Sequence, residues 1–188
     1  MPSDTQSTIP DEHAALSALT KEVSAIKDFG LVRIDDRLIH GQVIIVWRRH
    51  RTFTRIVIVD DGVAADPFMQ EVLKMAAPPD LQVEVYSVAQ GIAVLTQDRV
   101  DRETTMVLVR SPQVARQLFD GGVIYRALNV GGLGLAPGRK NVFKSISISD
   151  DEIAILKYLM ENGVDIAFYS VPGEKPKMLG DLIHRGNR

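Results

Sequence analysis

The sequence predicts a three-layer α/β fold, in which a mostly parallel central sheet of about six or seven strands has helices on both faces. Short runs of β-branched and apolar residues recur along the chain, as in Arg55–Asp60 and Thr105–Arg110. Runs that are apolar throughout are typical of parallel strands covered on both faces. Segments with helical spacing and clear helix starts lie between these runs. Strands that alternate with helices in this way favour one parallel sheet between two layers of helices.

The composition is that of one globular domain. The chain has 188 residues, of which 45% are hydrophobic and 24% charged, which is enough for one substantial core. A net charge of -2 argues against a nucleic-acid-binding protein. There is no cysteine, and none of the four histidines has the spacing of a metal site, so no metal or other cofactor is expected. Without a long apolar run or a secretory signal, the protein is expected in the cytoplasm.

The first half of the predicted domain contains three strands, each followed by a helix. Asp66 before Pro67 is a typical helix start, with a capping aspartate and a proline in the first turn. Pro78–Pro79 ends that helix. Asp60–Gly62 is interpreted as a loop. The predicted strands cover 31–34, 55–60 and 81–88, and the predicted helices begin at Gly41, at Pro67 and shortly before Ile92.

The second half continues the alternation. Ser111 before Pro112 repeats the cap-and-proline helix start, and Ser149 with Glu152 matches a capping box. The alternating segment Val142–Ser149 is interpreted as a single sixth strand. The other predicted strands cover 105–110, 127–132 and 165–169, and the predicted helices cover 112–120, 149–162 and 178–183.

Residues 1–29 differ from the rest and are predicted to be an N-terminal extension to a domain at 30–188. Met1–Pro10 has no buried periodicity, which predicts disorder. Asp11–Lys27 has a narrow apolar stripe at helical spacing. Such a helix is either a surface helix or a docking element for a partner or second subunit, which leaves a homo-oligomer open.

Chemistry is concentrated in Arg33–Val43, where a predicted strand passes through a charged loop into a helix. His40 lies at that junction. In an open α/β sheet this edge, at the carboxyl ends of the strands, is where ligands bind. A neutral imidazole is a nucleophile at physiological pH. The alternative is an ordinary half-buried histidine at the start of a helix.

Cationic groups surround His40. Arg33 and Arg37 carry guanidinium groups, which are suited to bidentate phosphate binding. The following helix directs its free N–H groups to the same place, and Gly41 lets a ligand approach the backbone. These groups predict phosphoryl transfer to His40, with both arginines on the phosphate. Taken singly, the arginines are equally explained as solvated surface charges.

Four further polar residues are assigned supporting roles. Asp36, and less strongly Asp35, is predicted to orient His40 or to steady an arginine. Gln42 would add a donor in the first helical turn, and Ser111 a hydrogen bond to phosphate. The aspartates are otherwise turn formers, and the serine an N-cap.

The segment 33–43 resembles the phosphorylation-site signature of the IIB component of the mannose/fructose/sorbose family of bacterial sugar phosphotransferase systems. Further landmarks of that family recur in order at 56–61, 74–79, 109–112, 121–123 and 128–132, so the resemblance covers about 31–183. It implies that His40 accepts phosphate from a phosphorylated IIA protein and passes it to a sugar imported through membrane IIC and IID components, with which the protein would associate. Leu133–Gly138 and Ser111 depart from the family pattern, which leaves the sugar and the details of partner choice open.

Two other functions are retained as alternatives. One is a phosphorylation-dependent regulatory module that transfers phosphate to no sugar, for which the extension would be a docking element. The other is nucleotidyl transfer, because another α/β family places His-x-Gly-His after its first strand, but Gln42 stands where its second histidine would be. His50 and its neighbouring arginines are interpreted as cations at a helix end, or as contacts to an acidic partner.

Overall fold

The computed structural model describes residues 27–183. It contains a seven-stranded sheet of order β3-β2-β4-β1-β5-β8-β9, in which β9 alone is antiparallel, and a separate β6-β7 hairpin. The strands of the main sheet are β1 (Leu31–Asp35), β2 (Arg55–Val59), β3 (Gln82–Tyr86), β4 (Thr105–Val109), β5 (Ala127–Gly132), β8 (Asp165–Phe168) and β9 (Lys177–Met178). The helices are α2 (Gly41–His50), α3 (Asp61–Ala64), α4 (Pro67–Ala76), α5 (Val88–Leu95), α6 (Pro112–Asp120), α7 (Asp150–Glu161) and α8 (Leu179–Ile183).

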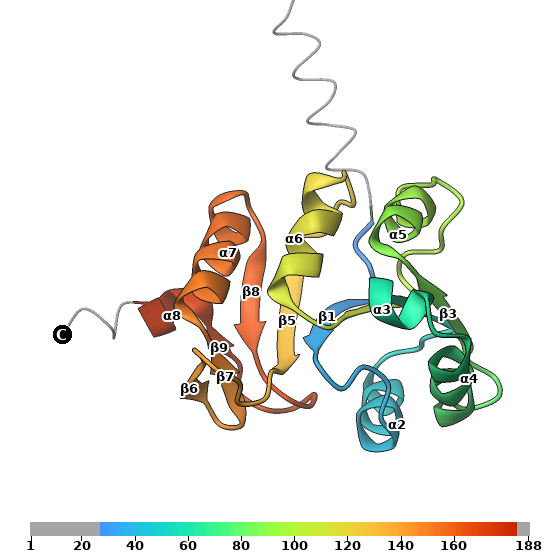
Figure 1. Ribbon diagram of the computed structural model, residues 1–188, viewed down its shortest axis with the longest axis horizontal. Helices are drawn as coiled ribbons and strands as arrows, with labels where there is room; N and C mark the ends of the chain where they lie inside the picture. Colours follow the sequence, from blue (N-terminus) through green and yellow to red (C-terminus); the bar gives the residue numbers. More distant parts are fainter. Residues whose placement is uncertain (1–26, 184–188) are drawn as a thin grey trace, which may run out of the picture.

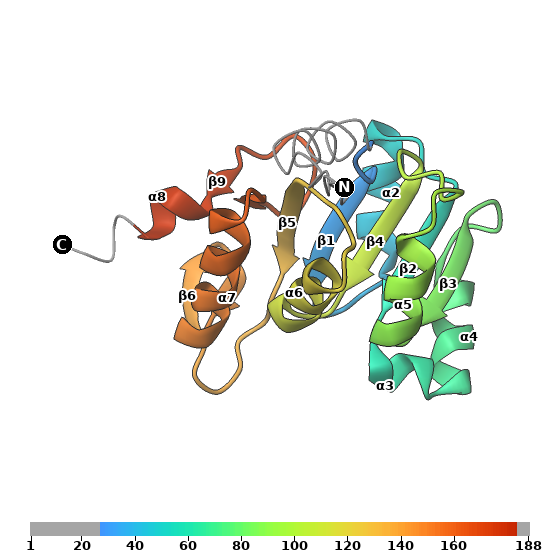
Figure 2. The same ribbon diagram turned by 90° about the horizontal axis from the view of Figure 1, so that it is seen from above.

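The strand order explains how the helices divide between the two faces of the sheet. The chain runs outwards from β1 to β2 and β3 through α2 and α4, and then returns through α5, α6 and α7 to β4, β5 and β8. Because such crossovers are right-handed, reversing direction moves the helices to the opposite face. Figures 1 and 2 show α2 and α4 on one side of the sheet and α5, α6 and α7 on the other. The predicted three-layer fold is confirmed.

Strand alternation separates the core into two layers. Val32 and Ile34 of β1 belong to the layer under α5, α6 and α7. Leu31 belongs to the other layer, with Ile44 and Trp47 of α2. All five residues of β1 are buried, as expected for a central strand covered on both faces.

Side-chain caps place the starts of α4 and α7 where the sequence predicts them, whereas Ser87 caps α5 and ends the strand predicted for 81–88 early. Ser149 and Glu152 form a capping box at α7, and Asp66 accepts a hydrogen bond from the backbone of Met69 at the start of α4. Asp60 caps α3 by accepting from the backbone N–H of Val63 at 2.9 Å. The loop predicted there is therefore wrong, because this cap converts it into a short helix.

The segment predicted as the sixth strand, Val142–Ser149, is instead part of a hairpin. β6 (Lys140–Phe143) and β7 (Ile146–Ile148) pair antiparallel outside the main sheet. Between them Lys144 adopts a φ of +48°, which turns the chain back. The edge strand β9 was not predicted at all, because two residues are too few to show a periodicity.

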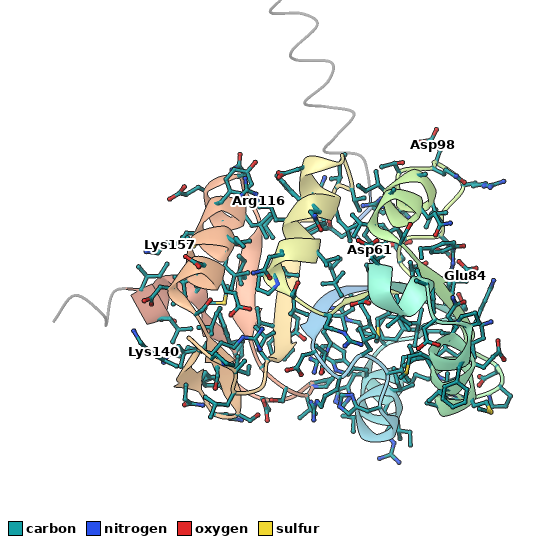
Figure 3. The ribbon with its side chains drawn as sticks, in the orientation of Figure 1. Asp61, Glu84, Asp98, Arg116, Lys140 and Lys157 are labelled. Carbon is teal, nitrogen blue, oxygen red and sulfur yellow. The ribbon has the colours of Figure 1, made fainter. Side chains whose placement is uncertain are left out.

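Figure 3 shows that the labelled charged side chains come from separate elements, among them Asp61, Arg116 and Lys140. Acidic and basic groups are thus interspersed, in keeping with the small net charge. Within residues 27–183, no helix is long and apolar enough to span a membrane. The predictions for Met1–Pro10 and the helix within Asp11–Lys27, apart from Lys27 itself, lie outside the described residues, as do His13 and His184.

Candidate phosphohistidine site

The site lies where neighbouring strands send the chain to opposite faces of the sheet. β1 continues into α2 on one face, while its neighbours β4 and β5 continue towards α6 and α7 on the other. The loops that leave such a switch point diverge and expose the carboxyl ends of the strands, where ligands bind in open α/β sheets. The loop 36–40 emerges from β1 at this point, with His40 at its end.

His40 is the N-cap residue of α2, in an extended conformation and half-buried. Its side chain makes no capping hydrogen bond; instead ring atom Nδ1 lies 3.1 Å from the carbonyl oxygen of Leu38. Leu38 has a φ of +55° and a side chain only 2% exposed, and its N–H bonds to the Asp35 carbonyl. The anchored turn therefore holds the imidazole at the helix start, and the first-turn N–H groups stay available to an anion.

Arg37 is the exposed cation of this loop, with a side chain 58% accessible. Its Nε donates to Oδ1 of Asp35 at 3.2 Å, and its backbone N–H donates to the same oxygen. Among residues 27–183, its two terminal nitrogens have no partner in the structure. Arg37 is thus fixed at its base and open at its tip, as a phosphate-binding arginine requires.

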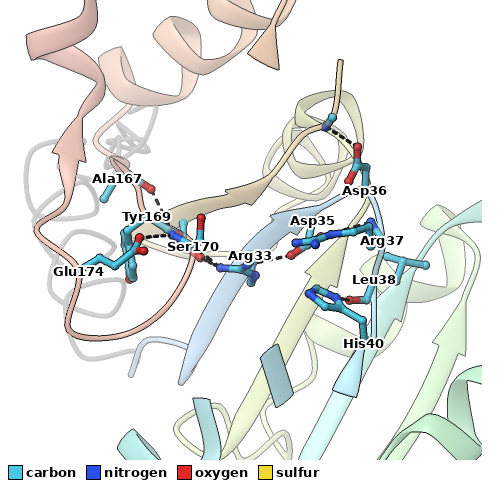
Figure 4. Close-up of polar contacts among 12 residues, drawn as sticks. Arg33, Asp35, Asp36, Arg37, Leu38, His40, Ala167, Tyr169, Ser170 and Glu174 are labelled. Atoms are coloured by element: carbon cyan, nitrogen blue, oxygen red, sulfur yellow. Dashed lines mark hydrogen bonds and ion pairs between the residues drawn. The ribbon is translucent and has the colours of Figure 1, made fainter. Parts of the chain in front are cut away.

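Arg33 and Asp35 are both inaccessible to solvent, and their side chains bond to each other at 2.8 Å. Burial lowers the pKa of Arg33, which the adjacent carboxylate of Asp35 opposes. Nη1 of Arg33 also donates to Oδ1 of Asn129 at 2.5 Å. The predicted direct phosphate contact is therefore corrected: Arg33 points into the protein and supports Asp35, which in turn holds Arg37 (Figure 4).

Asp36 was predicted to orient His40 or to steady an arginine, and its contacts correspond to the second of these roles, with Arg139 as the arginine. Its Oδ2 accepts from the backbone N–H of Gly134 at 2.6 Å and lies 3.9 Å from Nη1 of Arg139. Arg139 also pairs with Glu152 at the start of α7. Asp36 therefore joins the loop after β1 to the loop after β5, rather than orienting His40, because its side chain points towards β5.

The remaining predicted residues lie around the same edge. A Cβ at Gly41 would meet nothing within 4 Å, so a ligand could approach this backbone; that role stays a prediction. Ser111 caps α6 through its Oγ, 3.4 Å from the N–H of Val114, and a phosphate contact from it is untested. Gln42 lies in the first turn of α2, as predicted.

Sequence reasoning missed Asn129, although it had a detectable signal. Asn129 is a polar residue in the otherwise apolar strand β5, and it is only 3% exposed. Arg110, which was predicted as the last residue of a strand, follows β4 and pairs with Asp60 at 3.2 Å. As for metals, the structure shows no group of three histidine, cysteine or acidic residues able to hold an ion between residues 27 and 183.

Comparisons with known proteins agree with this geometry. The family model for the PTS system sorbose subfamily IIB component matches residues 29–188. The sorbose-specific EIIB component of Klebsiella pneumoniae is 36% identical over 154 residues, 82% of this chain and 94% of that protein. The crystal structure of the IIBSor domain of the sorbose permease from the same organism is similar with a TM-score of 0.78 and 33% identity, covering 85% of this chain and 98% of that one.

The mannose-specific EIIAB component of Escherichia coli K12 is 35% identical over 156 residues. Those residues are 83% of this chain but 48% of the relative, so the chain spans about half the length of such EIIAB proteins. The family match covers both the predicted histidine loop and the whole described sheet. The chain therefore belongs to the sorbose-subfamily IIB components of the sugar phosphotransferase system.

Proposed function

We propose that His40 accepts a phosphoryl group from a phosphorylated IIA protein and passes it to a sugar imported through membrane IIC and IID components. The observation that supports this most directly is the combination at one helix start: a histidine that leaves the first-turn N–H groups uncapped, and an arginine with a free guanidinium tip. Both belong to the loop that joins β1 to α2 (Figure 4).

In the first step, a ring nitrogen of His40 attacks phosphorus as the bond to the donor histidine of IIA breaks, and that imidazole leaves. In the second, a sugar hydroxyl attacks phosphorus as the bond from phosphorus to the His40 nitrogen breaks, and the hydroxyl proton passes to the released imidazole. Charge spreads over the phosphoryl oxygens in both transition states, so catalysis depends on placing positive groups around them. The exposed guanidinium of Arg37 and the N-terminus of α2 would supply these positive groups.

The partners belong to the proposal as well. The mannose relatives are named EIIAB components, which supports a IIA protein as the phosphoryl donor. The relatives include sorbose-, mannose-, N-acetylgalactosamine- and fructose-specific proteins, so the substrate class is a sugar of unspecified identity. A cytoplasmic location, beside membrane IIC and IID, completes the proposal.

Phosphate mapping tests the acceptor. The protein is incubated with phosphorylated IIA, and the modified residue is located by mass spectrometry under conditions that preserve phosphohistidine. We expect His40→Gln to abolish the modification while the protein stays folded, because the half-buried ring contributes nucleophilicity rather than core volume. The matched control is His50→Gln, which changes an exposed histidine at the other end of the same helix. Phosphate that persists in His40→Gln, or disappears in His50→Gln, contradicts the assignment.

Onward transfer separates the proposal from the regulatory alternative. Membrane vesicles that contain IIC and IID are supplied with sugar, phosphorylated IIA and this protein. Sugar phosphate should form with the unchanged protein and not with His40→Gln. Phosphorylation of His40 without sugar phosphate, for every sugar and every IIC/IID pair tested, would favour the regulatory module. Family membership argues against the nucleotidyltransferase alternative.

A further inference from the structure

Asn129 is a buried amide whose hydrogen bonds join three strands. It lies in β5 between β1 and β8, and it is 3% exposed. Its Oδ1 accepts from Nη1 of Arg33, and its Nδ2 donates to the carbonyl of Tyr169 at 2.9 Å. A buried amide is costly unless it is hydrogen-bonded. In Asn129 both polar atoms of the amide are hydrogen-bonded, the oxygen to a residue on the side of the histidine site and the nitrogen to a residue on the other side.

The strand register brings Asn129 to Arg33. These two residues are direct partners in the parallel pairing of β1 with β5, so their side chains lie next to each other on one face of the sheet. Gly131, two residues further on, leaves room for the guanidinium, which a Cβ there would approach to 1.8 Å. Arg33 is thus enclosed and depends on nearby acceptors to satisfy its donors.

From Arg33 the contacts continue to the surface. Nη2 of Arg33 donates to Oδ2 of Asp35, and Oδ1 of Asp35 accepts from the backbone and the Nε of Arg37. Figure 4 shows these contacts from the carbonyl of Tyr169 through Arg33 and Asp35 to Arg37, which belongs to the same loop as His40. Every side chain between Asn129 and Arg37 is fully buried. The exposed guanidinium of Arg37 is therefore the outer end of a series of hydrogen-bonded side chains whose inner end is fixed in the sheet.

We propose that Asn129 is a positioning residue for phosphoryl transfer. Its neutral oxygen accepts from one amino group of Arg33 without competing with the Asp35 carboxylate for the guanidinium charge. Asp35 therefore keeps its contacts with both arginines, and the side chain of Arg37 keeps its direction. Positive groups accelerate transfer only when they are already in place as charge develops. The inference rests on the proposed function, because it concerns the rate at which His40 is phosphorylated.

A double-mutant cycle tests the inference. Single-turnover transfer from saturating phosphorylated IIA is measured for the unchanged protein, Asn129→Leu, Arg37→Gln and the double variant. Leucine keeps the approximate volume of asparagine but neither of its hydrogen bonds. We expect Asn129→Leu to slow transfer by about tenfold, equivalent to one hydrogen bond. In the Arg37→Gln background the same change should have less than about a twofold effect, because no guanidinium remains to be positioned.

Thr105→Val is the matched control. Thr105 is 1% exposed, and its hydroxyl donates to the Asp101 carbonyl at the opposite end of the sheet. This change also removes a buried hydrogen bond, and it should leave the transfer rate unchanged. Thermal denaturation of each variant fixes a temperature at which all are folded.

The outcomes separate the two proposals. If the unchanged protein takes no phosphate on His40, the proposed function fails. If it does, equal slowing by Asn129→Leu in both backgrounds, or no slowing at all, overturns the positioning role. Should Asn129→Leu not fold, the cycle is run with Asn129→Asp. That variant keeps the shape but draws Arg33 towards a second carboxylate, so it should also slow transfer only while Arg37 is present.

Discussion

Substituting Gly131 by alanine should break the buried support of the site. Gly131 lies near the end of β5, and a Cβ there would be 1.8 Å from both Cζ and Nη1 of Arg33. Non-bonded heavy atoms pack at about 3.5 Å, so the guanidinium would have to move by more than about 1 Å. It is fully enclosed and bonded on two sides, so moving it breaks the contacts with Asn129 and Asp35.

The loss of stability depends mainly on Asp35, which would be left buried without its partner Arg33. Overpacking alone costs about 1–3 kcal/mol, whereas a buried ion pair that loses one partner costs about 3–5 kcal/mol. We expect the larger figure to dominate, because Asp35 has no access to solvent and cannot replace Arg33 by water. For a domain of this size, each kcal/mol lowers the melting temperature by about 2–4 °C. Gly131→Ala should therefore melt roughly 10 °C below the unchanged protein.

Calorimetry or circular dichroism measures this difference, with Gly180→Ala as the matched control. The same atom is added there, but it would meet nothing within 4 Å, and Gly180 lies in a helix. The control should melt at or slightly above the temperature of the unchanged protein. If Gly131→Ala melted within 2 °C of Gly180→Ala, the guanidinium would have room to move, and the argument that it is rigidly held would be refuted.

Three further predictions concern other parts of the chain. Arg37→Lys should slow transfer to His40 by roughly tenfold to a hundredfold in single-turnover assays. An ammonium cannot bridge two phosphate oxygens, and the lost hydrogen bond is worth about 1.5–3 kcal/mol. An unchanged rate would show that Arg37 does not bind the phosphate. Burial tends to raise the pKa of Glu152, but hydrogen bonds from Arg139 and from the Ser149 backbone outweigh it and leave that pKa lowered. Ionised Glu152 therefore stabilises the fold above the ordinary glutamate pKa, and this stabilisation is lost as pH falls through the lowered pKa. Urea titrations should find Glu152→Gln about 1.5 kcal/mol less stable near neutral pH, with the gap closing in acid; a gap that is constant with pH would contradict this. A chain that begins at Asp28 should fold, melt within a few degrees of the full chain and still accept phosphate, because the family match begins at residue 29; an insoluble or inactive product would make the extension part of the domain.

The fold was predictable to the extent that local signals determine it. Continuous apolar runs identified strands such as β2 and β4, alternation identified β3, and paired cap and proline signals placed the starts of α4 and α6. The hairpin was missed because Val142–Ser149 alternates like one strand. Its interruption depends on Lys144, which adopts a positive φ that lysine rarely takes, so the sequence offers no residue typical of a turn there.

The histidine loop was located correctly, and Asp35 pairs with arginines as predicted, but the direct phosphate contact predicted for Arg33 was wrong. Sequence reasoning treated Arg33 and Arg37 as equivalent because both flank His40 in the chain. The structure makes one a fully buried support and leaves the other more than half exposed. The distinction depends on where the strand ends, since Arg33 lies within β1 and Arg37 in the loop beyond it.

Part of that distinction was nevertheless present in the sequence. Residues two apart on a strand point to the same face, so a strand through Arg33 and Asp35 places both side chains together. If the strand is covered on both faces, as its apolar neighbours indicate, these two charges are buried and must pair with each other. Arg33 was then predictable as the partner of Asp35. What no local pattern could provide is the contact between Asn129 and Arg33, which are almost a hundred residues apart, because this contact depends on β5 lying beside β1 in one particular register.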